Sequence, residues 1–190
     1  MLKPASLTPL TALSLGLLAQ EAGLPDGVLQ VLPGSGYEAG NALATHPLIR
    51  KIGFTGSTEV GTKIMKLAAD DIKRVSLELG GKSPNIVFAD ADWQRAALES
   101  PMSVFANTGQ DCCARSRMFI EQSIFDDFVS QFVAATEKLN IGNPLLDETQ
   151  IGPMVSSAQR ELSESFIAEA KGDGRNILTG GARLSGSGFC

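Results

Sequence analysis

The sequence has few of the residues that stabilise a fold through disulfide bonds or bound metal ions. It has three cysteines and a single histidine, His46, among 190 residues. Cys112 and Cys113 are adjacent, so they do not form a disulfide framework, and one histidine leaves too few soft ligands for an ordinary zinc site. The composition therefore predicts no metal site and favours a reducing, cytoplasmic setting.

The chain also lacks a long apolar run and a cluster of basic charge. Residues 10–22 are the most apolar early segment, but this segment is too short to span a bilayer and follows no basic signal region. The 16 basic and 21 acidic residues give a net charge of -5 without a block of either sign. A nucleic-acid surface needs clustered lysine and arginine. We therefore expect no membrane span, no targeting signal and no nucleic-acid partner.

The first half of the chain alternates helical and strand patterns. A hydrophobic fraction of 43% over 190 residues is typical of a globular protein with one ordinary domain or two small ones. Apolar spacing and turn residues predict, in order, an amphipathic helix that is capped by Thr8 and begins at Pro9, a strand over 28–32, a short helix ending at 45, a strand over 51–55 and a helix from 58. This order predicts a parallel sheet with covering helices.

The second half continues the alternation. The predicted strands cover residues 74–79, 85–88, 118–121 and 176–178, and the predicted helices cover 92–107, 123–139 and 156–171. Pro101 lies inside one of these helices and lacks an amide donor, so it should bend or break the helix near Glu99. The pair Gly80-Gly81 is the predicted boundary between domains over residues 1–80 and 81–190.

Residues 105–117 hold the candidate nucleophile, Cys112. A catalytic cysteine is partly exposed, has a lowered pKa and lies where backbone N–H groups can receive an oxyanion. Residues 109–112, between a helix and a strand, are able to place the sulfur on such a turn. The alternative is that Cys112 and Cys113 are small buried residues, and spacing alone favours it because free cysteine is among the most buried residue types.

Glu78 is the candidate general base. A glutamate at the end of a strand and facing a cleft is able to take a proton from water. The alternative, which the pattern supports equally, is that Glu78 simply points to solvent from an edge strand. Residues 56–61 form a glycine-containing turn from strand to helix, where backbone N–H groups and the helix dipole favour a phosphate. The same kind of turn is common without any ligand.

Five motifs, in order along the whole chain, resemble those of the NAD(P)-dependent aldehyde dehydrogenase superfamily. They are Lys3-Pro-Ala-Ser with Thr8-Pro-Leu-Thr-Ala-Leu, Pro33-Gly-Ser-Gly, Phe54-Thr-Gly-Ser-Thr-Glu-Val-Gly, Leu77-Glu-Leu-Gly-Gly-Lys-Ser-Pro-Asn-Ile and Gly109-Gln-Asp-Cys-Cys-Ala-Arg-Ser-Arg. The resemblance implies an α/β fold, with a Rossmann-like parallel-sheet half-domain followed by part of an α/β catalytic domain.

The resemblance also implies the chemistry. Cys112 would add to an aldehyde as a thiohemiacetal, and Glu78 would activate the water that hydrolyses the resulting thioester to a carboxylic acid. The implied cofactor is NAD or NADP. Its implied contacts are Lys3 and Ser6 at the adenosine ribose, Gly36 and Gly40 along the adenosine pocket, Ser57 at the pyrophosphate, and Leu79 and Gly80 beside the nicotinamide. Many NAD-preferring members have glutamate at the position of Ser6, so NADP remains open.

Two family motifs are absent, and this leads us to expect a central fragment, truncated at both ends. The Pro-Trp-Asn motif with the second oxyanion donor and the Glu-x-Phe-Gly-Pro motif at the nicotinamide ribose do not occur. Losing one oxyanion donor costs roughly 10²- to 10³-fold in rate. We therefore expect the isolated chain to have little dehydrogenase activity, and we expect homo-oligomers only of complete members.

Two other functions remain open on sequence alone. The chain could be a non-enzymatic remnant of such an enzyme with a structural role. It could also be a cysteine hydrolase, because an activated thiol beside a base cleaves esters without a cofactor. Nucleotide binding separates the dehydrogenase from both alternatives. The identity of the aldehyde is not predicted.

Overall fold

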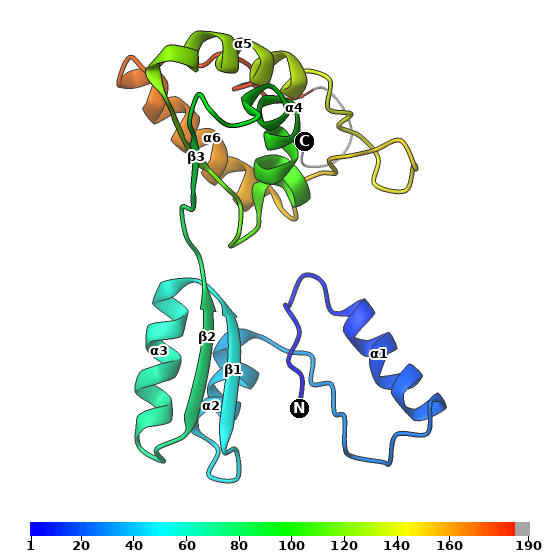
Figure 1. Ribbon diagram of the computed structural model, residues 1–190. Helices are drawn as coiled ribbons and strands as arrows, with labels where there is room; N and C mark the ends of the chain where they lie inside the picture. The colour runs from blue at the N-terminus through cyan, green and yellow to red at the C-terminus, as the bar shows by residue number, and fades with distance from the viewer. Residues whose placement is uncertain (185–190) are drawn as a thin grey trace. The chain divides into compact units, whose positions relative to one another are not determined.

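The computed structural model describes residues 1–184. The chain divides at the glycine pair into two compact units, Met1–Gly80 and Gly81–Cys190 (Figure 1). Each unit contains one two-stranded parallel sheet with helices beside it. The prediction of an α/β fold with parallel strands is confirmed.

The first unit follows the predicted helix-strand order, with one exception described below. Its elements are α1 (Leu10–Glu21), a π-turn (Gly36–Gly40), α2 (Asn41–Thr45), β1 (Lys51–Gly56), α3 (Thr58–Ala69) and β2 (Arg74–Leu79). The two strands pair in parallel, with Lys51 opposite Arg74 and Gly56 opposite Leu79. Both strands therefore end at the same edge of the sheet, where α3 begins.

Helix α3 lies close against β2. Ser57 caps the helix, because its Oγ accepts a hydrogen bond of 3.2 Å from the Val60 amide. A Cβ atom added to Gly61 would lie 2.7 Å from Leu79 Cδ2, closer than side chains pack in proteins. Glycine at this position therefore permits the close approach of helix and strand.

We expect Ser57→Ala to lower the free energy of unfolding by about 1 kcal/mol, because loss of a serine cap costs about 0.5–2 kcal/mol. Urea denaturation followed by circular dichroism measures the change. The matched control is Ser14→Ala, which removes a hydroxyl that donates to the Leu10 carbonyl inside α1. This control should stay within about 0.5 kcal/mol of the unsubstituted chain. An equal loss in both variants would contradict the capping role.

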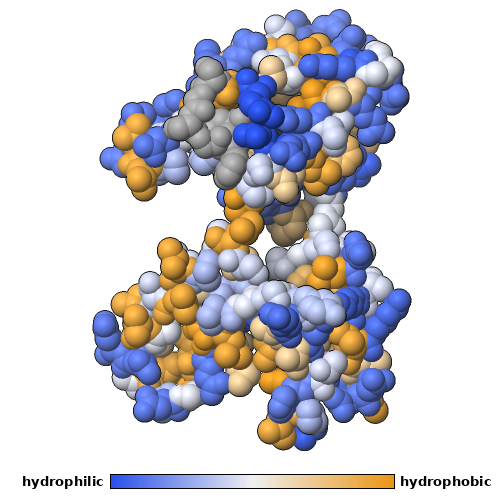
Figure 2. All heavy atoms as spheres, turned by 180° about the vertical axis from the view of Figure 1, so that it is seen from behind, coloured by the Kyte–Doolittle hydropathy of each residue, from blue (hydrophilic) through white to orange (hydrophobic). Residues whose placement is uncertain are grey.

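Helix α1 differs from its prediction in burial. The helix forms, one residue later than expected and without a side-chain cap, but none of its residues is buried. Apolar residues, including alanine as well as leucine, occur on all sides of the helix, and Leu10 and Leu17 are 75% and 64% exposed. The expected amphipathic character is therefore wrong, since an amphipathic helix needs one polar face. Figure 2 shows apolar side chains exposed on both units.

The predicted strand over residues 28–32 is also wrong. Only a single parallel bridge joins Leu2 to Val31, supported by hydrogen bonds from the Leu2 amide to the Gln30 carbonyl and from the Leu32 amide to the Leu2 carbonyl. A strand needs a partner along its length, and here one residue supplies the pairing. Within residues 1–184, no helix combines the length and apolar character needed to cross a membrane.

The second unit contains the predicted strands and helices before residue 173. Its elements are β3 (Pro84–Val87), α4 (Trp93–Phe105), β4 (Arg117–Ile120), α5 (Phe125–Thr136) and α6 (Ser157–Gly172). Strands β3 and β4 pair in parallel, and α4 packs against α5. The core cluster consists of Val87, Ala97, Ile124 and Phe128, and the rings of Phe128 and Phe132 stack with centroids 6.3 Å apart.

Three details of this unit do not follow from local patterns. Helix α4 continues without a break through Pro101, which is fully buried, so packing offsets the missing amide hydrogen bond. Phe125 is 43% exposed, although Phe128, one helical turn further along α5, is fully buried. The expected strand over residues 176–178 does not form, because no described segment pairs with it.

Candidate active site

The loop between α4 and β4 carries Cys112 and has a specific backbone conformation. Asn107, Thr108 and Gly109 have φ angles of 51°, 57° and 73°. Consecutive left-handed residues are uncommon outside glycine, and a β-branched threonine in this region is strained. The turn is stabilised by hydrogen bonds of 3.0 Å from the Gln110 amide to the Asn107 carbonyl and 3.1 Å from Asn107 Nδ2 to the Gln110 carbonyl.

The same loop holds the two cysteines at the surface. The Arg115 amide donates to the Ser103 carbonyl of α4 at 3.1 Å, which fixes the loop against the helix. Cys112 and Cys113 are both exposed, so the alternative that they are buried core residues is wrong. Among residues 1–184, no acceptor takes the Cys112 amide N–H. This amide is thus available to an oxygen atom of a ligand.

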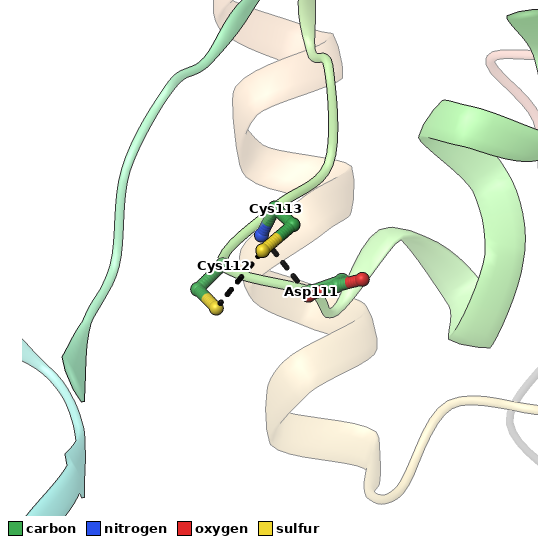
Figure 3. Close-up of side chains that lie close together, drawn as sticks. All are labelled: Asp111, Cys112 and Cys113. Atoms are coloured by element: carbon green, nitrogen blue, oxygen red, sulfur yellow. Dashed lines mark hydrogen bonds between the residues drawn. The ribbon is translucent and has the colours of Figure 1, made fainter.

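The groups around Cys112 raise the pKa of its thiol. The Sγ atoms of Cys112 and Cys113 lie 3.7 Å apart, and Asp111 Oδ1 accepts a 3.0 Å hydrogen bond from the Cys113 amide (Figure 3). The hydrogen bond with Cys113 raises the pKa of the Cys112 thiol, and the charges of Cys113 and Asp111 raise it further. This direction is opposite to the lowered pKa that the sequence argument requires. The described residues therefore make Cys112 accessible without lowering the pKa of its thiol.

The segment after the glycine pair lies beside the cysteine loop. A Cβ atom added to Gly81 would lie 3.8 Å from the Cys112 carbonyl oxygen. The Arg117 side chain donates to the Lys82 carbonyl at 2.8 Å, and its amide donates to the Ser83 carbonyl at 3.3 Å. Two of the sequence motifs, which are far apart along the chain, therefore meet within the second unit.

Glu78 lies on β2 in the first unit, opposite Thr55 of β1. Its side chain is exposed, whereas its neighbours Leu77 and Leu79 are half-buried beside Gly61 of α3. Exposure agrees with both alternatives that the sequence leaves open for Glu78. It belongs to the first unit, whereas Cys112 belongs to the second.

The residues assigned to the adenosine side converge on one backbone carbonyl. Lys3 Nζ and Ser6 Oγ each donate a 3.2 Å hydrogen bond to the Gly34 carbonyl oxygen. A Cβ atom on Gly40 would lie 3.9 Å from Lys3 Cδ, and Gly36 begins the π-turn that leads to Gly40. The sequence argument missed Gly34. Its φ of 154° and a would-be Cβ contact of 3.1 Å with Ala39 favour glycine, and its place in the Pro33-Gly-Ser-Gly motif was the available signal.

The remaining cofactor candidates share the carboxyl edge of the first sheet. Ser57 follows β1, Leu79 is the last residue of β2 and lies opposite Gly56, and Gly80 follows β2. The N-terminus of the 12-residue helix α3 is at this edge, and helix N-termini bind phosphates. A cavity of about 230 Å³ in the same unit is lined in part by Lys3. Hydroxyl groups, an ammonium group and a helix N-terminus suit the riboses and phosphates of a dinucleotide, so the residues present fit this cofactor.

Comparison with known proteins gives consistent matches along the chain. Residues 1–190 match the aldehyde dehydrogenase family. The chain is 46% identical over 190 residues to the cytosolic 10-formyltetrahydrofolate dehydrogenase of Homo sapiens. It superposes with a TM-score of 0.95 at 42% identity on an NAD-dependent aldehyde dehydrogenase from Sinorhizobium meliloti. It also superposes with a TM-score of 0.93 at 43% identity on an indole-3-acetaldehyde dehydrogenase crystallised with NAD+.

These matches cover nearly all of the chain and a minor part of each relative. The human match covers 100% of this chain and 21% of that protein. The Sinorhizobium match covers 98% of this chain and 37% of that chain, and the indole-3-acetaldehyde dehydrogenase match covers 96% and 37%. The chain therefore spans between about a fifth and two-fifths of the length of these relatives.

Proposed function

Because the chain belongs to the aldehyde dehydrogenase family, we propose that it carries the catalytic thiol and part of the nucleotide site of an NAD(P)-dependent oxidoreductase that converts an aldehyde to a carboxylic acid. The observation that carries the proposal is the exposed Cys112 on the loop before β4, within a chain whose residues 1–190 all match the family.

In this proposal Cys112 Sγ attacks the carbonyl carbon of the aldehyde. A carbon–sulfur bond forms, the thiol proton goes to solvent or a base, and the carbonyl oxygen becomes an oxyanion. The Cys112 amide N–H, which no described acceptor takes, donates to that oxyanion. Such donors favour the reaction because they stabilise charge where it develops.

Glu78 acts in the second half of the reaction. NAD(P)+, when bound, supplies the acceptor for the hydride that leaves the thiohemiacetal carbon, and this oxidation gives a thioester. Glu78 then takes a proton from a water molecule, whose oxygen attacks the thioester and releases the carboxylic acid. Cys112 returns to a free thiol. The raised pKa of the Cys112 thiol favours its release in protonated form when the thioester is hydrolysed. It also slows the first attack at neutral pH, because the thiolate is the attacking form.

The nucleotide contacts lie in the first unit. Lys3 and Ser6 would hold the adenosine ribose, with Gly36 and Gly40 leaving room for the adenosine. The α3 N-terminus at Ser57 would bind the pyrophosphate. Leu79, the last residue of β2, and Gly80, which follows it, would contact the nicotinamide. The donor pair on the Gly34 carbonyl supports the ribose assignment, because both groups already converge on one point.

Titration with NAD+ and NADP+ tests the cofactor proposal directly. We expect the purified chain to bind both, because Ser6 places no carboxylate against a 2′-phosphate. Ser6→Glu should weaken NADP+ binding by roughly tenfold or more, since like-charge pairs cost several kcal/mol, while NAD+ binding changes little. Isothermal titration calorimetry measures both affinities.

The matched control for this titration is Ser165→Glu, which adds the same charge to exposed α6 of the second unit. It should leave both affinities unchanged. If the unsubstituted chain bound neither nucleotide, the cofactor assignment would be contradicted and a non-enzymatic remnant would become the better explanation.

The setting and substrate follow from the same chemistry. The substrate is a small-molecule aldehyde, and the two free thiols suit a reducing compartment such as the cytoplasm. We expect homo-oligomers of the full-length family member.

A further inference from the structure

Three potential metal ligands lie together on the cysteine loop. Asp111, Cys112 and Cys113 each offer one ligand atom, and these three atoms lie within 4.8 Å of one another (Figure 3). All three residues are exposed. We propose that they form a binding site for one thiophilic divalent cation, of the class of Zn²⁺, and that occupation of this site blocks the Cys112 thiol.

The distance between the sulfur atoms carries the proposal. In a tetrahedral zinc site with Zn–S bonds of about 2.3 Å, two thiolates lie about 3.8 Å apart. The Sγ atoms of Cys112 and Cys113 lie 3.7 Å apart. A disulfide between the same atoms would require them to approach to about 2.05 Å. The two sulfur atoms are therefore at the spacing of thiolates that share a cation and too far apart for a disulfide.

The carboxylate supplies a third ligand. Its oxygen needs to lie about 3.6 Å from each sulfur when the Zn–O bond is about 2.1 Å long. The three ligand atoms lie within 4.8 Å of one another, so a shift of the carboxylate by about an ångström is enough to reach this distance. Asp111 Oδ1 accepts the Cys113 amide hydrogen at 3.0 Å, and an outer hydrogen bond of this kind orients a ligating group. Two thiolates and a carboxylate carry a charge that a dication partly neutralises.

Binding involves no oxidation. Each thiol releases its proton to solvent, two metal–sulfur bonds and one metal–oxygen bond form, and water takes the remaining exposed position. This three-ligand site on one loop differs from a structural zinc site, which is closed by four protein ligands. With its sulfur lone pair on the metal, Cys112 no longer attacks an electrophile. That consequence rests on the proposed function, whereas the binding site does not.

Titration of the reduced, chelator-treated chain with Cd²⁺ tests the site. The cadmium–thiolate charge-transfer absorption in the ultraviolet should saturate at one Cd²⁺ per chain, and Zn²⁺ should displace it. Cys112→Ser and Cys113→Ser should each weaken binding roughly 100-fold or more, because groups that only orient a ligand already contribute about 10- to 100-fold. Asp111→Asn should weaken it by about tenfold.

The matched control is Cys190→Ser, which removes the third cysteine, outside the described residues. It should leave the affinity unchanged, and circular dichroism should show all four variants folded because the three site residues are exposed. Absence of saturable binding in the unsubstituted chain, or unchanged binding in Cys113→Ser, would overturn the site.

A second readout separates the site from its consequence. Mass spectrometry after a short iodoacetamide treatment should show Cys112 alkylated in the metal-free chain and protected by Zn²⁺. Protection should be lost in Cys113→Ser. Saturable Cd²⁺ binding without protection would overturn the blocking of Cys112. If Cys112 is alkylated but the chain is neither acylated by an ester nor able to bind a nucleotide, the proposed function alone is contradicted.

Discussion

Cys112→Ser abolishes acylation of the chain by an activated ester such as p-nitrophenyl acetate. We expect a loss of roughly 10³-fold or more, because a serine hydroxyl without an adjacent base is a poor nucleophile and removal of a nucleophile is among the costliest changes in covalent catalysis. Nitrophenolate release gives the rate. Mass spectrometry of the trapped chain locates the acyl group. This acylation assay needs no cofactor.

Cys113→Ala provides the matched control, and it should change the rate of Cys112 acylation in a defined direction. Cys113→Ala removes the hydrogen bond and the charge that raise the pKa of Cys112. The pKa of Cys112 then falls towards its ordinary value, the thiolate fraction at neutral pH rises, and acylation becomes faster. In the unsubstituted chain the rate should rise with pH for the same reason. An acyl group found on Cys113, or slower acylation of Cys113→Ala, would contradict the assignment.

Phe128→Ala destabilises the second unit by about 3–5 kcal/mol, the usual cost of truncating a buried phenylalanine. Phe128 is fully buried, belongs to the core cluster and stacks on Phe132. Trp93 packs against the same cluster and is the single tryptophan of the chain, so its fluorescence reports unfolding of this unit. Urea titration measures the change in the free energy of unfolding.

Phe166→Ala is the matched control, because Phe166 on α6 is 64% exposed and should contribute within about 0.5 kcal/mol. Should Phe128→Ala fail to fold, Phe128→Leu keeps part of the buried volume and gives an intermediate loss of about 1–2 kcal/mol. Equal midpoints for Phe128→Ala and Phe166→Ala would refute the placement of the core.

Most of the secondary structure could be predicted from local patterns. Alternation over residues 74–79 and the serine caps at Ser57 and Ser156 mark elements within a residue or two of their observed ends. These signals are local, because a cap or a strand periodicity involves neighbours in sequence. The failures at residues 28–32 and 176–178 share one cause. A strand exists only with a partner, and the partner is not encoded in the strand itself.

The candidate site was predictable only in part. Through the resemblance, the motifs predict Cys112, Glu78 and the nucleotide contacts as site residues, whereas spacing alone favours buried cysteines. The exposure of Cys112 and the raised pKa of its thiol come from the loop conformation and from Cys113 and Asp111 in space. Gly34 also escaped prediction, since its role as a shared acceptor depends on side chains 31 and 28 residues away.

The sequence by itself determined the order of helices and strands, the parallel α/β class and the motifs that identify the family, because these depend on local periodicity and residue type. Only the tertiary structure decided that α1 has no buried face, that Lys3 and Ser6 meet at Gly34, and that the two thiols lie 3.7 Å apart at the surface. Burial, hydrogen bonding between distant segments and the pKa of a thiol are set by neighbours in space, which chain order does not reveal.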